Sequence, residues 1–451
     1  MITVMKFGGT SVGSAEAFSR TADIIASGAG NKAVIVSAMS GVTNMLVGLL
    51  ESEIDKFANM RELFEEKHLA AARVVISPSL FPEFSAEFSK RMNDLTALMT
   101  SKEARKDPYF KDNLSSQGER FSSLILAYVL RSKGHDSVAM TSEEAGIFAT
   151  GKPGAGEADL EKTALGLSVN VVPLLAKGTI PVITGFYGRS NTGKPLTFGR
   201  GGSDYSAAAV ANAINADCLE IWTDVDGFMS ADPRVVPDAM VIDEMNFGEA
   251  AELAYFGAKV LHPRTIEPVR VKHIPLKVKN SFNPGAPGTL IHHLRTPKSE
   301  LLRSVASKVD LSIITVSSAE IAYRPRMVSH IIEKLADADV MVYAISTSLS
   351  TISFLIHNLD VKETLKHLNT LSSGDIERID VKSNMSLICA VGDNLLSKCG
   401  VSADIFGAVK DANANVELIS EGASEVSLNF VVPMDRSMDV VRMLHERFVG
   451  E

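Results

Sequence analysis

The sequence predicts an α/β sandwich with a mainly parallel sheet, followed by two small ferredoxin-like (α+β) modules. Two observations lead to this prediction. In the first two thirds of the 451-residue chain, short apolar runs alternate with helical patterns, as in sheets that helices cover on both faces. In the last third, one pattern of strands and helices occurs twice, which is typical of a duplicated small module.

Four apolar, β-branched runs predict the buried strands. Each is apolar almost throughout, as is typical of parallel strands with helices on both faces of the sheet. The runs cover residues 32–40, 179–187, 218–225 and 274–280. Ligands are expected outside the carboxyl ends of such strands.

Three segments between these runs predict helices. Residues 45–76 and 84–105 are charged and carry apolar residues at heptad-like spacing. Residues 203–216, SDYSAAAVANAINA, are rich in alanine and begin with Ser203 and Asp204. Residues of these two types commonly cap the start of a helix.

The repeat follows a polar, Pro-containing linker at 288–302. Its copies are DADVMVYAISTSLSTISFLI (337–356) and DANANVELISEGASEVSLNFVV (411–432), with Ile345 matching Ile419. Each copy is preceded by a strand and a helix and followed by a helix, which indicates a βαββαβ-like module. Because neither copy has a glycine-rich loop or a polar cluster, we expect regulation or dimerisation from these modules rather than catalysis.

Composition narrows the class of protein. The net charge of −9 gives no electrostatic reason to expect nucleic acid or an anionic membrane as a partner. No apolar run approaches the roughly 20 residues of a membrane span, and no leader precedes the first strand. Cys218, Cys389 and Cys399 are scattered and odd in number, so no disulfide framework or zinc site is indicated. We expect a cytoplasmic protein.

The first motif that could carry chemistry is VMKFGGTSVGS at 4–14. Lys6 stands near the end of a predicted strand, and Gly8 and Gly9 leave the next turn without side chains. Thr10 and Ser11 offer hydroxyls to cap a helix that begins there. Bare amides beside an ammonium group favour an anion, most often a phosphate, although a tight turn with an exposed lysine would have the same sequence.

The second motif is TFGRGGSDYSA at 197–207. Arg200 lies between glycines, and its planar guanidinium suits a carboxylate or a phosphate. Asp204 could simply cap the helix that starts here. A cap does not require the preceding Arg-Gly-Gly, so the motif favours an anion site.

Three further stretches are less specific. WTDVDGFMSADPRVVPDA at 222–239 is either a surface loop or a strand-end loop that holds a nucleotide, with Arg234 on its phosphates. Lys259 lies in FGAKVLHPRT at 256–265, and Glu119 in SSQGERFSS at 115–123. The phosphate-loop, dinucleotide, GxSxG and HExxH motifs are absent from the sequence, so those classes are excluded.

Five ordered motifs together resemble those of the aspartokinases, which belong to the amino acid kinase family. The motifs are KFGGTS (6–11), VSAMSGVTN (36–44), GRGGSD (199–204), TDVDGF with DPR (223–234) and FGAKVLHPRT (256–265). The resemblance implies an amino acid kinase-type three-layer sandwich over residues 1–295. The repeat is similar to that family's paired ACT domains, which would cover 303–375 and 383–451. No fused homoserine dehydrogenase is expected after Glu451.

The resemblance implies transfer of the ATP γ-phosphoryl group to the side-chain carboxylate of L-aspartate. The product would be 4-phospho-L-aspartate, on the route to lysine, threonine and methionine. A carboxylate with a pKa of about 3.9 is ionised at neutral pH and needs no general base. Such a transfer requires positioning and neutralisation of charge. ATP and Mg²⁺ are implied, and no protein ligand to the metal is predicted because phosphates usually hold this ion.

Matched motif by motif, the resemblance also implies a role for each candidate residue. Lys6 would stabilise the transferring phosphoryl group, and Asp204 would organise that lysine. Arg200 would bind the α-carboxylate of aspartate, and Glu119 its α-amino group. The other substrate-binding residues would be Ser37, Thr43 and Ser203, and those that contact ATP would be Lys6, Gly8, Gly9, Thr223, Asp224, Arg234 and Lys259.

Two other functional classes share part of the pattern. Another carboxylate-directed kinase, such as a glutamate kinase, has the same fold but is not expected to combine KFGGTS with paired ACT domains. A non-catalytic amino-acid sensor would keep the ACT pair without needing the charged site. Since Lys6, Arg200, Asp204 and Lys259 are all present, the sequence favours an active aspartate kinase.

The ACT pair predicts regulation and assembly. Exposed sheet edges of such modules commonly pair, so we expect a homodimer or larger homo-oligomer with an amino-acid effector. Lysine alone is expected to inhibit weakly, because lysine-sensitive relatives carry acidic residues where this chain has Tyr343 and Leu349. A smaller effector such as threonine could be bound by Ser346, Thr347 and Ser348. The alternative is a module that only dimerises.

Overall fold

The structure is a computed structural model that describes residues 1–50, 55–257, 260–294, 300–371, 376–393, 395, 398–421 and 424–449. Its contacts divide it into two compact units. Unit 1 comprises residues 1–228, 243–247 and 260–294, and unit 2 comprises residues 229–242, 248–259 and 295–451. The domain limits 1–295, 303–375 and 383–451 stay predictions.

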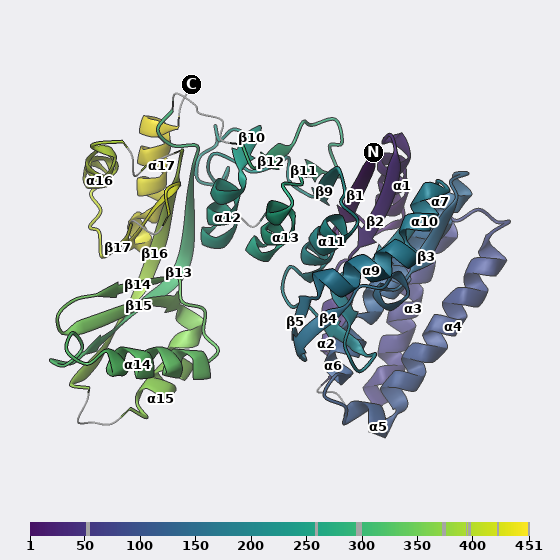
Figure 1. Ribbon diagram of the computed structural model, residues 1–451, viewed down its shortest axis with the longest axis horizontal. Helices are drawn as coiled ribbons and strands as arrows, with labels where there is room; N and C mark the ends of the chain where they lie inside the picture. The colour runs from purple at the N-terminus through teal and green to yellow at the C-terminus, as the bar shows by residue number, and fades with distance from the viewer. Residues whose placement is uncertain are drawn as a thin grey trace. The chain divides into compact units, whose positions relative to one another are not determined.

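Unit 1 is built on an eight-stranded sheet in the order β10-β12-β11-β9-β1-β2-β6-β3 (Figure 1). All neighbouring strands are parallel except β11 and β12, which are antiparallel. The strands are β1 (Ile2–Phe7), β2 (Asn31–Val36), β3 (Ser137–Met140), β6 (Ile180–Thr184), β9 (Cys218–Thr223), β10 (Glu244–Asn246), β11 (Leu276–Asn280) and β12 (Thr289–His292). The mainly parallel sheet predicted from the apolar runs is confirmed.

Helices cover both faces of this sheet, which gives three layers. One layer contains α1, α3, α4 and α7, which contact one another, and the other contains α9, α10, α11 and α13. The longer helices are α1 (Ala15–Ser27), α3 (Asp55–Val75), α4 (Phe81–Thr100), α7 (Gln117–Ser132), α9 (Leu160–Asn170) and α11 (Gly202–Ala213). The shorter ones are α2 (Val42–Val47), α5 (Lys102–Arg105), α6 (Phe110–Ser115), α8 (Ser142–Ala145), α10 (Val172–Ala176), the 3₁₀ turn Pro263–Thr265 and α13 (Ile266–Val271).

Side-chain alternation along β1 explains how the site is placed. Met5 and Phe7 belong to the buried cluster on the α1 and α7 face of the sheet. Because successive side chains of a strand point to opposite faces, Lys6 points to the α11 face. The sheet thus directs one charged side chain toward the start of α11.

Three helix predictions need correction. The predicted helix 45–76 is interrupted, since α2 ends at Val47 before Gly48 and α3 begins at Asp55. The helix 84–105 divides at Ser101, whose hydroxyl accepts from the Ala104 amide and starts α5. Thr10 and Ser11 do not cap α1, because Ser14 is the N-cap and accepts from the Ala17 amide.

Two small antiparallel hairpins complete unit 1. They are β4 (Ala149–Lys152) with β5 (Ala155–Ala158), and β7 (Tyr187–Arg189) with β8 (Pro195–Thr197). The second hairpin follows β6 and leads directly into the GRGGSD motif. It therefore fixes the path along which the chain reaches α11.

Unit 2 contains a six-stranded antiparallel sheet in the order β14-β15-β13-β16-β18-β17. Its strands are β13 (Ser304–Ser317), β14 (Ala344–Thr347), β15 (Thr351–His357), β16 (Arg378–Val391), β17 (Leu418–Ser420) and β18 (Ser427–Pro433). Its helices are α12 (Phe247–Phe256, from Gly248 onward), α14 (Pro325–Asp337), α15 (Val361–Leu368), α16 (Val401–Asp411) and α17 (Ser437–Phe448), with 3₁₀ turns at Asn358–Asp360 and Met434–Arg436. The two predicted ferredoxin-like modules are confirmed.

The two modules exchange strands. The second half of β13, residues 311–317, pairs with β15 and with residues 378–385 of β16, which completes the first module. The second half of β16, residues 385–391, pairs with β18 and with residues 304–308 of β13. The fourth strand of the second module therefore comes from the segment that precedes the first, and neither module is complete alone.

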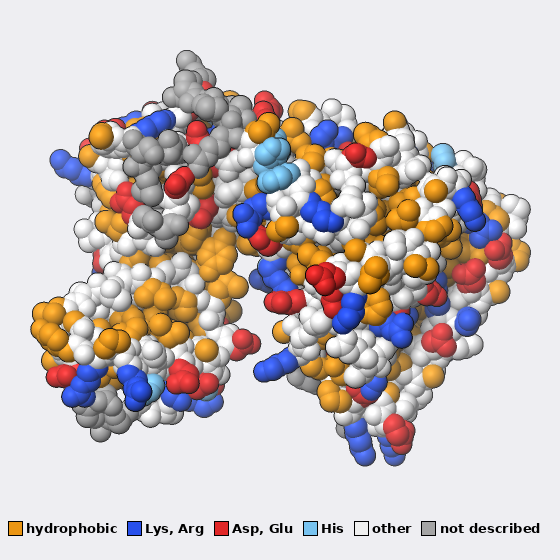
Figure 2. Space-filling model, viewed as in Figure 1, with side chains coloured by type: hydrophobic (Ala, Val, Ile, Leu, Met, Phe, Trp, Pro, Cys, Tyr) orange, Lys and Arg blue, Asp and Glu red, His pale blue; other side chains and the backbone are white. Residues whose placement is uncertain are grey.

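The surface and the helices of the described residues give two further observations. On the face drawn in Figure 2, basic and acidic side chains are interspersed over the described parts of both units. No helix within the described residues is long and apolar enough to span a membrane.

Candidate active site

Lys6 and Asp204 form the centre of the candidate site. The Lys6 Nζ lies 2.5 Å from the Asp204 Oδ1, and both side chains are largely buried. Asp204 does not cap α11, whose N-cap is Gly201 without a side-chain hydrogen bond. The alternative of a simple helix cap is therefore wrong, because the carboxylate is committed to the lysine.

Backbone groups without side chains surround this pair. A Cβ atom at Gly9 would lie 2.9 Å from the Ala38 carbonyl oxygen, and one at Gly8 would lie 3.5 Å from the Lys6 Nζ. The Ser40 amide donates to the Gly9 carbonyl, which ties the turn after β1 to the turn after β2. The bare backbone beside Lys6 fits the phosphate groups of a nucleotide.

These groups line a cavity of about 350 Å³ in unit 1. The structure brings eight of the predicted site residues to its wall: Lys6, Gly9, Ser37, Thr43, Glu119, Arg200, Ser203 and Asp204. They come from the ends of β1 and β2 and from the starts of α2, α7 and α11. Five separate segments of the sequence thus converge on one cavity.

Glu119 is the buried acid of the cavity. Its side chain is almost inaccessible, and within the described part of the chain its Oε2 has no hydrogen-bond partner. Burial raises the pKa of Glu119 to about 8, against the lowering effect of a backbone hydrogen bond from Ala38. A buried carboxylate oxygen without a donor on a cavity wall fits an ammonium group of a ligand.

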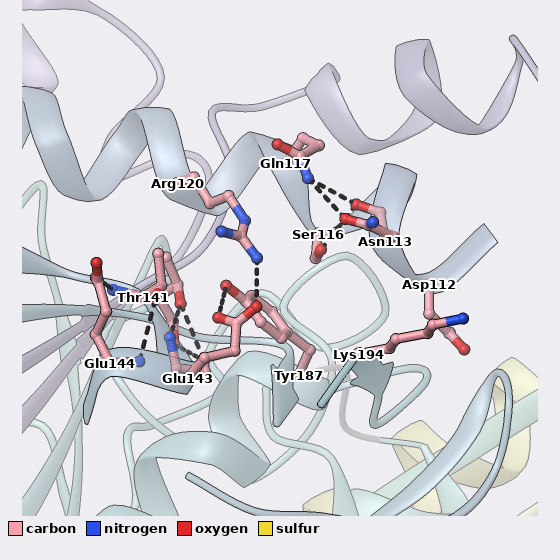
Figure 3. Close-up of polar contacts among 12 residues, drawn as sticks. Asp112, Asn113, Ser116, Gln117, Arg120, Thr141, Glu143, Glu144, Tyr187 and Lys194 are labelled. Carbon is pink, nitrogen blue, oxygen red and sulfur yellow. Dashed lines mark hydrogen bonds and ion pairs between the residues drawn. The ribbon is translucent and has the colours of Figure 1, made fainter. Parts of the chain in front are cut away.

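A charged network holds the helix that carries Glu119 (Figure 3). The Arg120 Nη2 lies 2.5 Å from the Glu143 Oε1, and the Tyr187 hydroxyl donates to the other oxygen of Glu143 at 2.9 Å. The Gln117 amide group donates to the backbone and side-chain oxygens of Asn113, both at 3.0 Å. The first turn of α7 is thereby anchored on both sides of Glu119.

The sequence analysis missed eight residues of the cavity wall. Phe186 is the most informative, because its backbone has φ of 79°, a conformation that bulky residues rarely adopt. It lies between β6 and β7, and a Cβ atom at Gly202 would come within 2.9 Å of its ring. No signal in the sequence indicates that strain. The others lie within the recognised motifs 36–44 and 199–204, next to the predicted residues; they are Ala38, Met39, Ser40, Gly41, Gly199, Gly201 and Gly202.

Of the described residues predicted to contact ATP, Lys6 and Gly9 line this cavity and the others lie elsewhere. Gly8 donates its amide to the Trp222 carbonyl, which joins the ends of β1 and β9. Thr223 ends β9, and its hydroxyl donates to Asp224 at 3.2 Å. Arg234 belongs to unit 2, where its exposed guanidinium pairs with Asp232 at 2.6 Å. Lys259 lies outside the described residues.

Metal binding gives no additional candidate. No group of three or more His, Cys, Asp or Glu side chains in the described ranges is arranged to hold a metal ion.

Models of two protein families match this chain. The model of the amino acid kinase family matches residues 1–280, and a model described as ACT domain matches residues 388–448. The chain is 33% identical over 454 residues to lysine-sensitive aspartokinase 3 of Escherichia coli, covering 98% of each protein. It is 32% identical to a bifunctional aspartokinase/homoserine dehydrogenase of Arabidopsis thaliana, covering 99% of this chain and 51% of that protein.

Solved structures agree with this placement. The crystal structure of E. coli aspartokinase III with aspartate and ADP matches with a TM-score of 0.85 and 32% identity, covering 100% of both chains. Clostridium acetobutylicum aspartate kinase matches with a TM-score of 0.81 and 25% identity, over 99% of this chain and 100% of that one. By sequence, fold and the residues that line its cavity, the chain belongs to the amino acid kinase family, as one of the aspartokinases.

Proposed function

We propose that the cavity of unit 1 binds L-aspartate next to the terminal phosphate of ATP and catalyses phosphoryl transfer between them. The observation that carries this proposal is the placement of the Lys6–Asp204 pair in the same cavity as the unpartnered Glu119 oxygen. A cation for the phosphoryl group and an acid for an amino group are the two features that this reaction needs.

The substrate contacts follow from charge and exposure. Glu119 receives the α-ammonium group of aspartate, and Arg200 binds the α-carboxylate through its planar guanidinium. Ser37, Thr43 and Ser203 offer hydroxyls along the same wall. With both α-groups held, the side-chain carboxylate is directed toward Lys6, which sets the distance between the reacting atoms.

The transfer step requires no proton to move. A carboxylate oxygen of aspartate attacks the γ-phosphorus while the bond from that phosphorus to the β–γ bridging oxygen breaks, giving 4-phospho-L-aspartate and ADP. Lys6 neutralises the charge on the moving group, and Asp204 keeps the lysine in place.

Gly8 and Gly9 leave the turn after β1 without side chains, so the phosphates can approach its backbone closely. Thr223, Asp224, Arg234 and Lys259 keep the ATP-binding role that the motifs imply. Mg²⁺ bound together with ATP would be held mainly by the phosphates and would screen their charge.

Unit 2 serves regulation in this proposal. Its ACT modules bind an amino-acid effector and join copies of the chain into a homodimer or larger homo-oligomer. We also propose a cytoplasmic location, which suits the free thiols of Cys218, Cys389 and Cys399.

The test is an assay of the purified chain with ATP, Mg²⁺ and L-aspartate, with hydroxylamine to trap the acyl phosphate. We expect aspartyl hydroxamate and ADP in equal amounts, and neither product from the variant Asp204→Ala. The same assay with L-glutamate in place of aspartate distinguishes an aspartate kinase from a glutamate kinase. Hydroxamate formed from glutamate alone would refute the assignment. Absence of ADP formation with either amino acid would support the non-catalytic sensor.

A further inference from the structure

The next-to-last residue of the FGAKVLHPRT motif is Arg264, which has no role in the proposed phosphoryl transfer. We propose that Arg264 is a positioning residue, which fixes the loop that carries Arg200 and thereby sets the affinity for aspartate. The inference rests on the role proposed for Arg200, and its test examines that role separately.

The loop around Arg200 is rich in glycine, and one backbone hydrogen bond spans it, from the Gly202 amide to the Gly199 carbonyl at 3.0 Å. Gly199 and Gly201 flank Arg200 with φ of 75° and 72°, so the backbone on both sides takes a conformation that suits glycine. The Arg200 side chain is exposed, and within the described ranges it makes no hydrogen bond or ion pair. Its position in the cavity therefore depends on the neighbours of the loop.

Arg264 supplies one such anchor at the start of the loop. Its Nη1 donates to the carbonyl of Phe198, the residue before Gly199, at 3.0 Å. Its Nη2 donates to the carbonyl of Gly156 in β5, also at 3.0 Å. One planar guanidinium thus joins the end of the β8 segment to a strand of the other hairpin.

The second anchor is the first turn of α11. The Arg264 guanidinium lies 4.8 Å from the centre of the Tyr205 ring, and that ring packs edge to face on Phe198. The Tyr205 hydroxyl also accepts from the Ala158 amide at 3.3 Å. Arg264 therefore contacts elements on both sides of the Arg200 loop.

Close packing leaves this arrangement little freedom. A Cβ atom at Gly156 would lie 2.8 Å from the Thr197 carbonyl oxygen, so β5 and β8 are in direct backbone contact. A Cβ atom at Gly201 would lie 2.3 Å from the Cβ of His262. The His262 Nδ1 in turn accepts from the Arg264 amide at 3.3 Å. The His-Pro-Arg segment is thus the surface against which the loop is set.

Loss of Arg264 should weaken aspartate binding selectively. The Phe198 and Gly156 carbonyls would lose their shared donor, and the two glycines would let the Arg200 loop sample more positions. Because the Lys6–Asp204 ion pair itself joins the first turn of α11 to β1, the phosphoryl site should be little affected. The predicted signature is a change in KM for aspartate without a matching change in kcat or in KM for ATP.

The experiment measures steady-state kinetics of Arg264→Ala, Arg200→Ala and the double variant. We expect Arg264→Ala to raise KM for aspartate about tenfold, with kcat and KM for ATP changed less than about twofold. In the Arg200→Ala background, Arg264→Ala should add less than about a twofold further change, because it acts through Arg200.

Controls keep the result interpretable. Arg270→Ala removes an exposed guanidinium of α13 that pairs with Glu267, and it should leave every constant unchanged. Arg264→Lys keeps the charge but not the planar pair of donors, so its KM for aspartate should be intermediate. This variant also replaces Arg264→Ala in the test if Arg264→Ala does not fold.

An unchanged KM for aspartate in Arg264→Ala, or an equal rise with and without Arg200, would overturn the proposal. An Arg200→Ala variant with normal KM would refute the role of Arg200 itself.

Discussion

The Nζ of Lys6 lies 2.5 Å from the Oδ1 of Asp204, which joins the first strand of unit 1 to the helix that begins at Gly202. The carboxylate lies in the first turn of α11, where the positive end of the helix dipole stabilises a negative charge. It is therefore suited to hold the ammonium group steady without withdrawing it from the cavity.

Replacement of this lysine should abolish turnover. Lys6→Ala removes a fixed positive charge from the phosphoryl-transfer transition state, and we expect kcat to fall by about 10²- to 10⁴-fold. The hydroxamate assay measures the loss, and circular dichroism shows whether the variant is folded. Lys177→Ala, which removes an exposed lysine, is the control and should retain normal activity. Activity of Lys6→Ala within tenfold of the original protein would contradict the proposed role.

Substitution of two arginines should distinguish a residue that binds aspartate from one that binds ATP. Arg200→Ala is expected to raise KM for aspartate at least about tenfold more than KM for ATP, because a bidentate contact with one ligand is lost. Arg234→Ala, in the DPR motif, should show the reverse pattern. The measurement is a matrix of initial rates at varied aspartate and ATP. Equal changes in both constants for Arg200→Ala would place that guanidinium on the phosphates instead.

Local signals made the layers and much of the cavity predictable from the sequence. Apolar runs predicted β1's neighbours in the sheet, and glycine pairs beside Lys6 and Arg200 predicted two anion-binding turns. These features depend on residues close together in the sequence, where turn and strand chemistry act directly. Eight candidate residues consequently meet at one cavity wall.

Long-range pairing cannot be derived from such local signals, and the Lys6–Asp204 pair was expected only through the resemblance to the aspartokinases. Asp204 forms an ion pair with Lys6 and does not cap its own helix, because β1 lies beside α11. Phe186, with its φ of 79°, directly precedes β7, and its carbonyl accepts from the amide of Phe198. The exchange of strands between β13 and β16 requires two segments about 70 residues apart to be equally good strands, and a repeat gives no preference between self-pairing and exchange.

Acid titration of Glu119 should control aspartate binding. Its pKa is raised to about 8 by burial, so the free enzyme holds this group protonated at neutral pH. The group must release its proton before it can pair with the α-ammonium of aspartate. We therefore expect kcat/KM for aspartate to rise about tenfold per pH unit up to pH 8 and then to level off.

The control for this pH profile is Glu119→Gln, which cannot ionise. It should bind aspartate weakly, with a profile that lacks the rise below pH 8. KM for ATP should follow neither change. A flat profile for the original protein between pH 6 and 9 would show that Glu119 is already ionised when aspartate arrives.

The same group predicts how stability depends on pH. Because the folded-state pKa of about 8 exceeds the value of 4.5 for a free glutamate, the folded chain binds the extra proton and loses stability as pH rises between these values. Near neutral pH, the free energy of unfolding of the original protein should therefore be lower than that of Glu119→Gln by roughly 3 kcal/mol. Urea unfolding of the unliganded proteins at pH 5 and pH 8.5 measures it. A variant no more stable than the original protein at pH 8.5 would contradict this account.

Regulation by lysine alone should be weak. An ammonium group in a closed pocket needs a carboxylate partner, and the residues at the first ACT module's β14 and its following turn are uncharged. Tyr343, just before β14, already has a cation on its ring, since the Lys308 Nζ lies 4.4 Å from the ring centre. Leu349 in the turn is exposed and apolar. A second ammonium group here would meet the like charge of Lys308.

Titration with each amino acid at limiting aspartate tests this prediction. Threonine, a neutral effector, can be met by the hydroxyls of Ser346, Thr347 and Ser348, so it is expected to inhibit at lower concentration than lysine. Tyr343→Asp is the informative variant, because it places a carboxylate beside the effector site predicted here, which could pair with the charge of a bound lysine. We expect this variant to become more sensitive to lysine without a change in its response to threonine. Strong inhibition of the original protein by submillimolar lysine would refute the prediction, since it would require an acidic partner elsewhere in the effector site.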